Sequence, residues 1–244
     1  MFSFGSGVLY GFRTDAGVDT PVNFGLVQEV SLDLAFDTKE LYGQYQFPVA
    51  VARGKAKFSG KAKLARLSGI AVGSLFFGIS PIAGQILTAL GEEQTVPGVT
   101  FQVTVDHQPQ FLIDYGVVYA ATGLPLTKVA AGPAVGQYTC DGAGVYNFAP
   151  EDEGEVLLFT YTYSTTAGEK IVSINKLLGD TPTFSANFYT TFQSKPITVK
   201  IPNCVSSKLT FPTKLDDFVM PDFEWSMFAD AAGNVATWSF GEAS

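Results

Sequence analysis

The chain has 244 residues, of which 46% are apolar and only 16% charged, and its formal net charge is -8. This composition excludes the disorder that follows from low hydrophobicity and high charge, and the acidic balance argues against tight non-specific binding to DNA, which needs Lys and Arg on the phosphates. In soluble proteins, about a quarter of all residues are charged. We therefore expect other chains to cover much of this protein's surface.

The opening residues MFSFGSGVLYGFRTD contain neither the basic segment nor the apolar segment of a secretory signal. We therefore expect synthesis and residence in the cytoplasm.

The two cysteines, Cys140 and Cys204, have unlike surroundings and no CxxC partner. This spacing predicts two free thiols.

The first long strand is predicted from Phe24 to Phe36. Apolar residues occupy nearly all its even positions, and Glu29, Asp33 and then Asp37 occupy odd ones. Such alternation is typical of a half-buried strand.

The second long strand is predicted in RGKAKFSGKAKLAR, Arg53 to Arg66, where the four lysines keep odd parity and small or apolar residues fill the even positions between them. If the two strands pair as an antiparallel hairpin, their polar faces coincide, and opposite charges add about 0.2 to 1 kcal/mol for each pair. The carboxylates of the first strand would then balance these lysines, although protection of a sheet edge by lysine is an alternative. The lysines are Lys55, Lys57, Lys61 and Lys63.

Between these strands, Asp37 to Ala52 is too long for a tight turn and too aromatic for an ordinary solvated loop. Exposed apolar residues here would form a patch of the kind that marks an interaction surface. We predict a projecting loop that docks on a neighbouring subunit. Its candidate contact residues are Leu41, Tyr42, Tyr45, Phe47 and Val49.

The stretch from Leu67 to Leu90 has no charge and is long enough to span a bilayer. Glycines and Pro81 divide it into short pieces, which favours the alternative of a short buried helix, Ser68 to Phe77, followed by an apolar strand or loop.

From Phe101 to Ile174, short apolar runs alternate with turn residues, which predicts a small β-sandwich or a stack of hairpins. Alternation returns in Thr183 to Gln193 and in Phe218 to Phe228. These two segments predict two more long strands, and NVATWSF near the end predicts a last strand.

Residues for catalysis are scarce. His107 is the one histidine, and a triad with Asp106 and either Ser6 or Ser74 lacks the nucleophile elbow GxSxG. The acidic run Glu151 to Glu155 lacks the calcium-loop pattern and is typical of a turn. No phosphate-binding glycine motif is present. The sequence predicts no enzyme and no catalytic, cofactor or metal residue.

Taken together, the order and phrasing of the chain resemble the major tail tube protein of bacteriophages with long non-contractile tails (siphophages). The resemblance lies in the opening FGSGVLYG, the run VSLDLAFDTKELYGQYQFPVAVARGKAKFSGKAKLARL followed by GIAVGSLFFG, and the end KLTFPTKLDDFVMPDFEWSMFADAAGNVATWSF. The middle segments GQYTCDGAGVYNFAPEDEGEVLLFTYTY and KLLGDTPTF also resemble inserts of such proteins.

The resemblance implies a mainly β fold, a tail-tube-type sandwich or barrel protomer with one short flanking helix and an inserted small β subdomain. The expected parts are residues 1–100 (arm, two long strands, docking loop and helix), 101–178 (insert) and 179–244 (two long strands and the C-terminal strand). Each protomer would give four long strands to a continuous inner barrel.

The same resemblance implies stacked hexameric rings that form a hollow tube for DNA ejection, located in the virion tail and assembled in the host cytoplasm. Implied partners are further copies, the tape measure, tail terminator and distal tail proteins, and DNA that passes without specific binding; no membrane span is expected. The candidate lumen-facing residues, with a summed charge of -1, are Glu29, Asp33, Asp37, Lys55, Lys57, Lys61, Lys63, Asp222 and Glu224.

A competing hypothesis is a carbohydrate- or partner-binding β-sandwich, such as an adhesin or decoration protein. It assigns the function to residues 101–174 and uses exposed aromatic rings as stacking surfaces. Those rings are Tyr115, Tyr119, Tyr138 and Tyr146.

Overall fold

The computed structural model describes residues 5, 7–13, 21–66, 68–192 and 195–241, and the fold is mainly β, as predicted. The chain divides into two compact units. Unit 1 comprises Met1–Pro81 and Ile171–Ser244, and unit 2 comprises Ile82–Lys170. The second unit differs from the expected insert 101–178, because the segment after Pro81 is a long strand that pairs inside unit 2.

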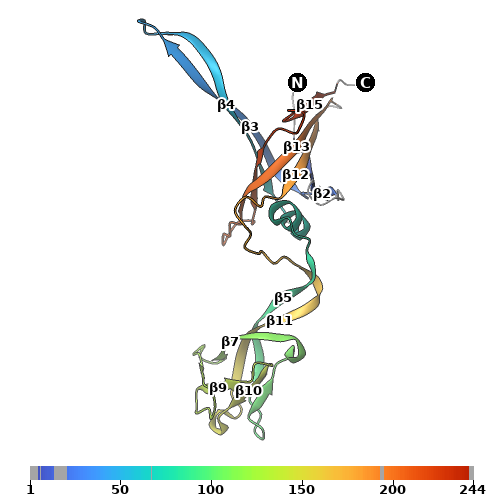
Figure 1. Ribbon diagram of the computed structural model, residues 1–244. Helices are drawn as coiled ribbons and strands as arrows, with labels where there is room; N and C mark the ends of the chain where they lie inside the picture. Colours follow the sequence, from blue (N-terminus) through green and yellow to red (C-terminus); the bar gives the residue numbers. More distant parts are fainter. Residues whose placement is uncertain (1–4, 6, 14–20, 67, 193–194, 242–244) are drawn as a thin grey trace. The chain divides into compact units, whose positions relative to one another are not determined.

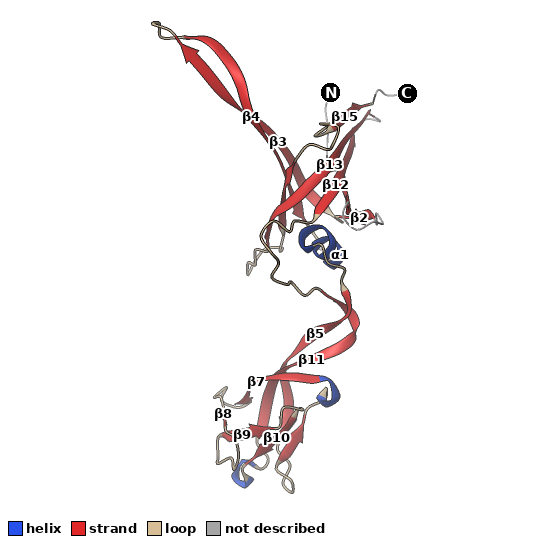
Figure 2. Cartoon of the chain, viewed as in Figure 1, coloured by secondary structure: helices blue, strands red, loops and turns tan. Residues whose placement is uncertain are grey.

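Unit 1 is built on one antiparallel sheet in the order β2-β1-β12-β13-β14-β4-β3, with β15 added on β13 (Figure 2). Its strands are β1 (Val8–Arg13), β2 (Pro21–Asn23), β3 (Val27–Tyr42), β4 (Pro48–Leu64), β12 (Thr183–Phe192), β13 (Lys195–Thr210), β14 (Asp222–Met227) and β15 (Thr237–Phe240). The predicted strands at 24–36, 53–66, 183–193 and 218–228 correspond to β3, β4, β12 and the shorter β14. Gln193 lies outside the described residues.

The predicted buried helix is confirmed. α1 (Gly69–Ala71) continues directly into a π-helical turn, η1 (Val72–Phe77), which ends at Gly78 in the left-handed conformation that glycine adopts most readily. Leu75 is 1% exposed and packs in the core of unit 1. In the described part of the chain, no helix is long and apolar enough to cross a membrane.

The core of unit 1 follows the predicted alternation. Phe58, Ala62 and Leu64 of β4 are buried, as are Phe223 and Trp225 of β14. Odd-numbered β4 residues lie on the other face, where the lysines remain accessible to solvent.

Unit 2 consists of two sheets around a second core. One sheet has the order β5-β11-β7, formed by β5 (Ile82–Thr95), β7 (Phe111–Tyr119) and β11 (Val156–Lys170). The other has the order β6-β10-β9-β8, formed by β6 (Gln102–Thr104), β8 (Thr127–Lys128), β9 (Gln137–Cys140) and β10 (Val145–Phe148). Two 3-10 turns, η2 (Gln108–Gln110) and η3 (Pro150–Asp152), complete the unit. The short strands expected as far as Ile174 end earlier, because β11 extends to Lys170 and residues 171–174 are not in a strand.

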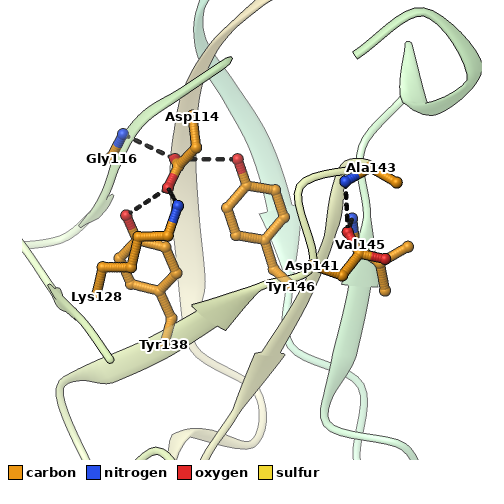
Figure 3. Close-up of polar contacts among 8 residues, drawn as sticks. All are labelled: Asp114, Gly116, Lys128, Tyr138, Asp141, Ala143, Val145 and Tyr146. Carbon is orange, nitrogen blue, oxygen red and sulfur yellow. Dashed lines mark hydrogen bonds and ion pairs between the residues drawn. The ribbon is translucent and has the colours of Figure 1, made fainter. Parts of the chain in front are cut away.

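A buried carboxylate joins the two sheets of unit 2. The Asp114 side chain on β7 is 4% exposed and accepts hydrogen bonds from Tyr138 (2.9 Å) and Tyr146 (3.1 Å) of the facing sheet. It also pairs with Lys128 Nζ at 2.9 Å and accepts a hydrogen bond from the Gly116 N–H at 2.9 Å (Figure 3). Satisfying all these groups at once fixes how the sheets face each other.

Candidate functional site: a charged sheet face and an apolar hairpin

The charged face of unit 1 spans β13, β14, β4 and β3. The strand register places Glu224 opposite Lys61, and it places Lys63 opposite both Asp222 and Glu29. These residues share one face because directly opposed residues of antiparallel strands point to the same side. Carboxylates and amines therefore alternate across the strands.

Ion pairs connect these rows. Lys63 Nζ lies 2.9 Å from Glu29, and Lys61 Nζ lies 3.0 Å from Asp222 and 3.6 Å from Glu224. On β13, Lys208 reaches Glu224 at 3.8 Å. The predicted balance between lysines and a carboxylate row is thus confirmed for Glu29, while Lys61 is balanced by β14 instead of β3.

Lys61 is the centre of this network. Its hydrogen bond with Asp222 raises the pKa of the Lys61 amine above its ordinary value, against the lowering effect of burial. The Lys61 side chain is 40% exposed, so each pair contributes at most about 1 kcal/mol.

Replacing Lys61 with Glu places three carboxylates together, and we expect unit 1 to lose about 1 kcal/mol of unfolding free energy. Both tryptophans of the chain lie in unit 1, so urea unfolding followed by tryptophan fluorescence measures the change. The matched control is Lys57→Glu on the same strand, where we expect less than about 0.5 kcal/mol. An equal loss in both variants, or a loss unaffected by added salt, would contradict this account.

The candidate lumen-facing residues nearer the end of the hairpin form no ion pairs in the described structure. Asp33 lies opposite Ser59, while Asp37 and Lys55 lie at a bulge between the pairs Phe36–Ala56 and Thr38–Arg53. Within the described residues, Asp33, Asp37, Lys55 and Lys57 form no ion pair. Asp33 lies on the face of Lys57 and Lys61, as predicted, but forms no ion pair with them. Asp37 lies at the bulge and forms no ion pair with a described residue either.

The predicted loop 37–52 is also wrong. β3 continues to Tyr42 and β4 begins at Pro48, so the segment is the end of a long hairpin with a short turn. Figure 1 shows this hairpin running beyond the rest of the sheet of unit 1. The candidate contact residues lie at its end and are all more than half exposed: Leu41 63%, Tyr42 56%, Tyr45 74%, Phe47 81% and Val49 66%.

The hairpin also forms a sheet edge. Among the described strands, β3 pairs with β4 alone, so one side of its 16 residues has no strand partner. Unpaired backbone groups along such a strand are a template for pairing with another chain.

The N-terminal arm is described from Gly7 onward and at Gly5, and β1 is an inner strand of the sheet.

The residues considered for catalysis do not come together as a described site. His107 lies in unit 2, where its ring stacks on Tyr163 with centroids 3.8 Å apart. Ser74 belongs to unit 1, and Ser6 lies outside the described residues. Nor do three or more His, Cys, Asp or Glu side chains gather as metal ligands within the described ranges.

The tyrosines proposed as stacking surfaces mostly point inward. Tyr138 is 3% exposed and Tyr146 is fully buried, because their hydroxyls bind Asp114 in the core. Tyr119 donates to the buried Asp152, which leaves Tyr115, at 62%, as the exposed ring of the set. The premise of the competing hypothesis is therefore wrong for Tyr138 and Tyr146.

Both cysteines are free, as predicted. Burial raises the pKa of the Cys204 thiol to about 12.

Comparison with models of known protein families gives no match, and comparison with curated proteins gives none either.

Proposed function

We propose that this chain is the tail tube subunit of a phage with a long non-contractile tail. Copies assemble as stacked hexameric rings, and DNA passes through the resulting hollow tube. The observation that carries the proposal is the long β3–β4 hairpin, which exposes apolar side chains at its end and an unpaired edge along β3.

The end of the hairpin needs a protein partner. An aromatic side chain presents about 200 Å², so the exposed fractions of Tyr42, Tyr45 and Phe47 together offer about 400 Å². A standard interface buries about 800 Å² on each partner. Three rings thus supply about half of one side of such an interface, and their aliphatic neighbours add to it.

The unpaired edge favours a partner that is another copy of the chain. If the β3 edge of one copy pairs with a different edge of the next copy, the contact joins different surfaces, and such contacts close into rings or extend as filaments. Closing a barrel across subunits would give β3 a partner and remove the aggregation risk of a long open edge.

The charged face suits the wall of a channel for DNA. Tight binding to DNA requires Lys and Arg on phosphates, whereas Lys61 and Lys63 are already paired with carboxylates. The nine candidate lumen residues sum to -1. A wall of this kind is hydrophilic and holds phosphate weakly. In the assembled tail, the tape measure, tail terminator and distal tail proteins would be the further partners.

The double variant Tyr45→Ser/Phe47→Ser removes the two most exposed rings of the hairpin. We expect it to remain monomeric under conditions where the parent chain forms six-fold rings or tubes, because the apolar contact between copies is lost. Negative-stain images and light scattering measure the assembly.

The matched control is Val99→Ser/Leu124→Ser, which removes apolar residues of unit 2 that are 91% and 62% exposed. We expect this control to assemble normally. A parent chain that stays monomeric over a wide range of concentrations would refute the tube proposal. Normal assembly of the hairpin variant would refute the role of the hairpin alone.

A further inference from the structure

Unit 2 contains a pocket that the tube proposal leaves unused. Its volume is about 450 Å³, within the range of small-molecule sites. It lies where β7 begins, since Phe111, the first residue of β7, pairs with Tyr163, and the next residues of β11 pair with β5 alone among the described strands. The lining residues are Leu87, His107, Gln110, Tyr163, Ser164, Thr165 and Thr166.

An aromatic wall forms one part of this pocket. The rings of His107 and Tyr163 stack at an angle of 12°. The main-chain N–H of His107 donates to the Tyr161 hydroxyl at 3.3 Å, and that hydroxyl in turn binds the Glu92 carboxylate. These contacts hold the turn that carries His107 against β11.

Apart from Leu87, the remaining lining residues are polar and include no acidic or basic side chain. Thr165 Oγ1 accepts a hydrogen bond from the Ala167 N–H at 3.2 Å. Within the described residues, the side chains of Gln110, Ser164 and Thr166 form no hydrogen bond with the protein. Their hydroxyl and amide groups can both donate and accept. The pocket therefore offers free hydrogen-bonding groups beside an apolar plane, without a carboxylate or an amine among its lining residues.

We propose that this pocket binds a neutral saccharide. A sugar ring presents a C–H face, which fits an aromatic wall, and a rim of hydroxyls, which fits donors and acceptors of this kind. The absence of Lys, Arg, Asp and Glu from the lining favours a neutral sugar over an acidic one, because burying a charge without a partner is costly. This site differs from the tyrosine surfaces considered from the sequence, and it does not depend on tube assembly.

The test uses the full chain and saturation-transfer NMR with lactose, maltose and diacetylchitobiose as neutral probes and glucuronic acid as an acidic probe. We expect at least one disaccharide to bind. Thr166→Val and Gln110→Ala, at exposed positions, should each weaken that binding roughly fivefold by removing one hydrogen bond. The matched control is Thr88→Val on β5, which lies opposite Thr162, on the other face of the sheet from Leu87 and Tyr163; we expect no change.

Several results would overturn the proposal. They are no binding of any disaccharide, equal binding by all three variants, or binding of glucuronic acid alone. Binding of a short neutral peptide at these residues in place of the sugars would also overturn it. Ring formation by the chain is measured separately, so failure of sugar binding and failure of assembly are distinguishable.

Discussion

Replacing Gly60 with alanine is expected to destabilise unit 1 by about 2 to 3 kcal/mol. Gly60 on β4 lies opposite Trp225 on β14, and the indole packs directly over it. A Cβ added at Gly60 would lie 2.2 Å from Trp225 Cε2 and 2.3 Å from Cζ2. Trp225 is 1% exposed and packs in the core of unit 1, so moving its ring would disturb the neighbouring core residues.

Tryptophan fluorescence during urea unfolding measures this effect, because Trp225 itself reports on its packing. The matched control is Gly43→Ala in the hairpin turn, where the nearest atom to an added Cβ is Val49 Cγ1 at 3.8 Å. We expect that variant to change the unfolding free energy by less than about 0.5 kcal/mol. Similar stability of the Gly60 and Gly43 variants would disprove the close packing of Trp225.

Period-two alternation predicted the strands that have one buried face. β4 from Phe58 onward and β12 are clear cases, because nearly every second residue packs in the core while its neighbours are more exposed. β13 was missed, although Ile197, Val199 and Ile201 alternate. Pro196 and Pro202 interrupt this alternation with residues that are disfavoured in central strands. In the structure, Pro202 lies where the pairing of β12 and β13 shifts by one residue, so a bulge accommodates it.

The end of the hairpin was predicted as a loop for a different reason. Residues of β3 beyond Asp33 are exposed on both faces, as are those of β4 before Phe58. Alternation is lost from Asp37 to Glu40, which contains no apolar residue, because no core contact requires one there. The excess of exposed aromatic residues was nevertheless predicted correctly, because it depends on composition and not on secondary structure.

The ion pairs of the charged face differ in whether they could be predicted from neighbouring segments of the sequence. Glu29 and Lys63 lie on strands that are neighbours in the chain, so a hairpin was enough to predict that they share a face. The pairing of Lys61 with Asp222 joins residues from opposite ends of the chain. It depends on β14 lying next to β4, and no spacing within the sequence reveals that neighbour.

The buried tyrosines of unit 2 had a signal that was overlooked. Asp114 interrupts the apolar run FLIDYGVVY of β7, and a carboxylate inside such a run must be paired if the strand is buried. Tyrosines on facing strands are suitable partners, because each carries a hydroxyl on an apolar body. An acidic residue within a core strand was therefore a reason to place some of the nearby tyrosines inside.

Replacing Asp114 with Asn is expected to destabilise unit 2 by about 3 kcal/mol, at the low end for breaking a buried pair because Lys128 is half exposed. Lys128 Nζ and the Tyr138 hydroxyl both donate to the same carboxylate oxygen. An amide in either orientation cannot replace both oxygens as acceptors, so at least one buried donor loses its partner.

The matched control is Asp141→Asn in the same unit. Asp141 Oδ1 accepts hydrogen bonds from the N–H groups of Ala143 at 2.7 Å and Val145 at 3.1 Å (Figure 3). An asparagine oxygen can accept both bonds, so we expect a loss below about 0.5 kcal/mol. Hydrogen exchange measured on peptides from 82–170 reports on unit 2, while tryptophan fluorescence should remain unchanged. Equal protection in the two variants would refute the central role of Asp114.

The stability of unit 2 at low pH should also depend on the Asp114 carboxylate. Burial alone would raise the pKa of Asp114, but hydrogen bonds from Lys128, Gly116 and Tyr138 outweigh it and lower the pKa below its ordinary value of 3.8. A group with a lowered pKa in the folded state stabilises fully above its unfolded pKa, and this contribution is lost as the pH falls below 3.8 through the folded value. Exchange protection of unit 2 should therefore decrease over that window in the parent chain. The Asp114→Asn variant has no carboxylate to protonate there, so the part of the decrease due to Asp114 should be absent, and an identical pH profile in both proteins would contradict the assignment.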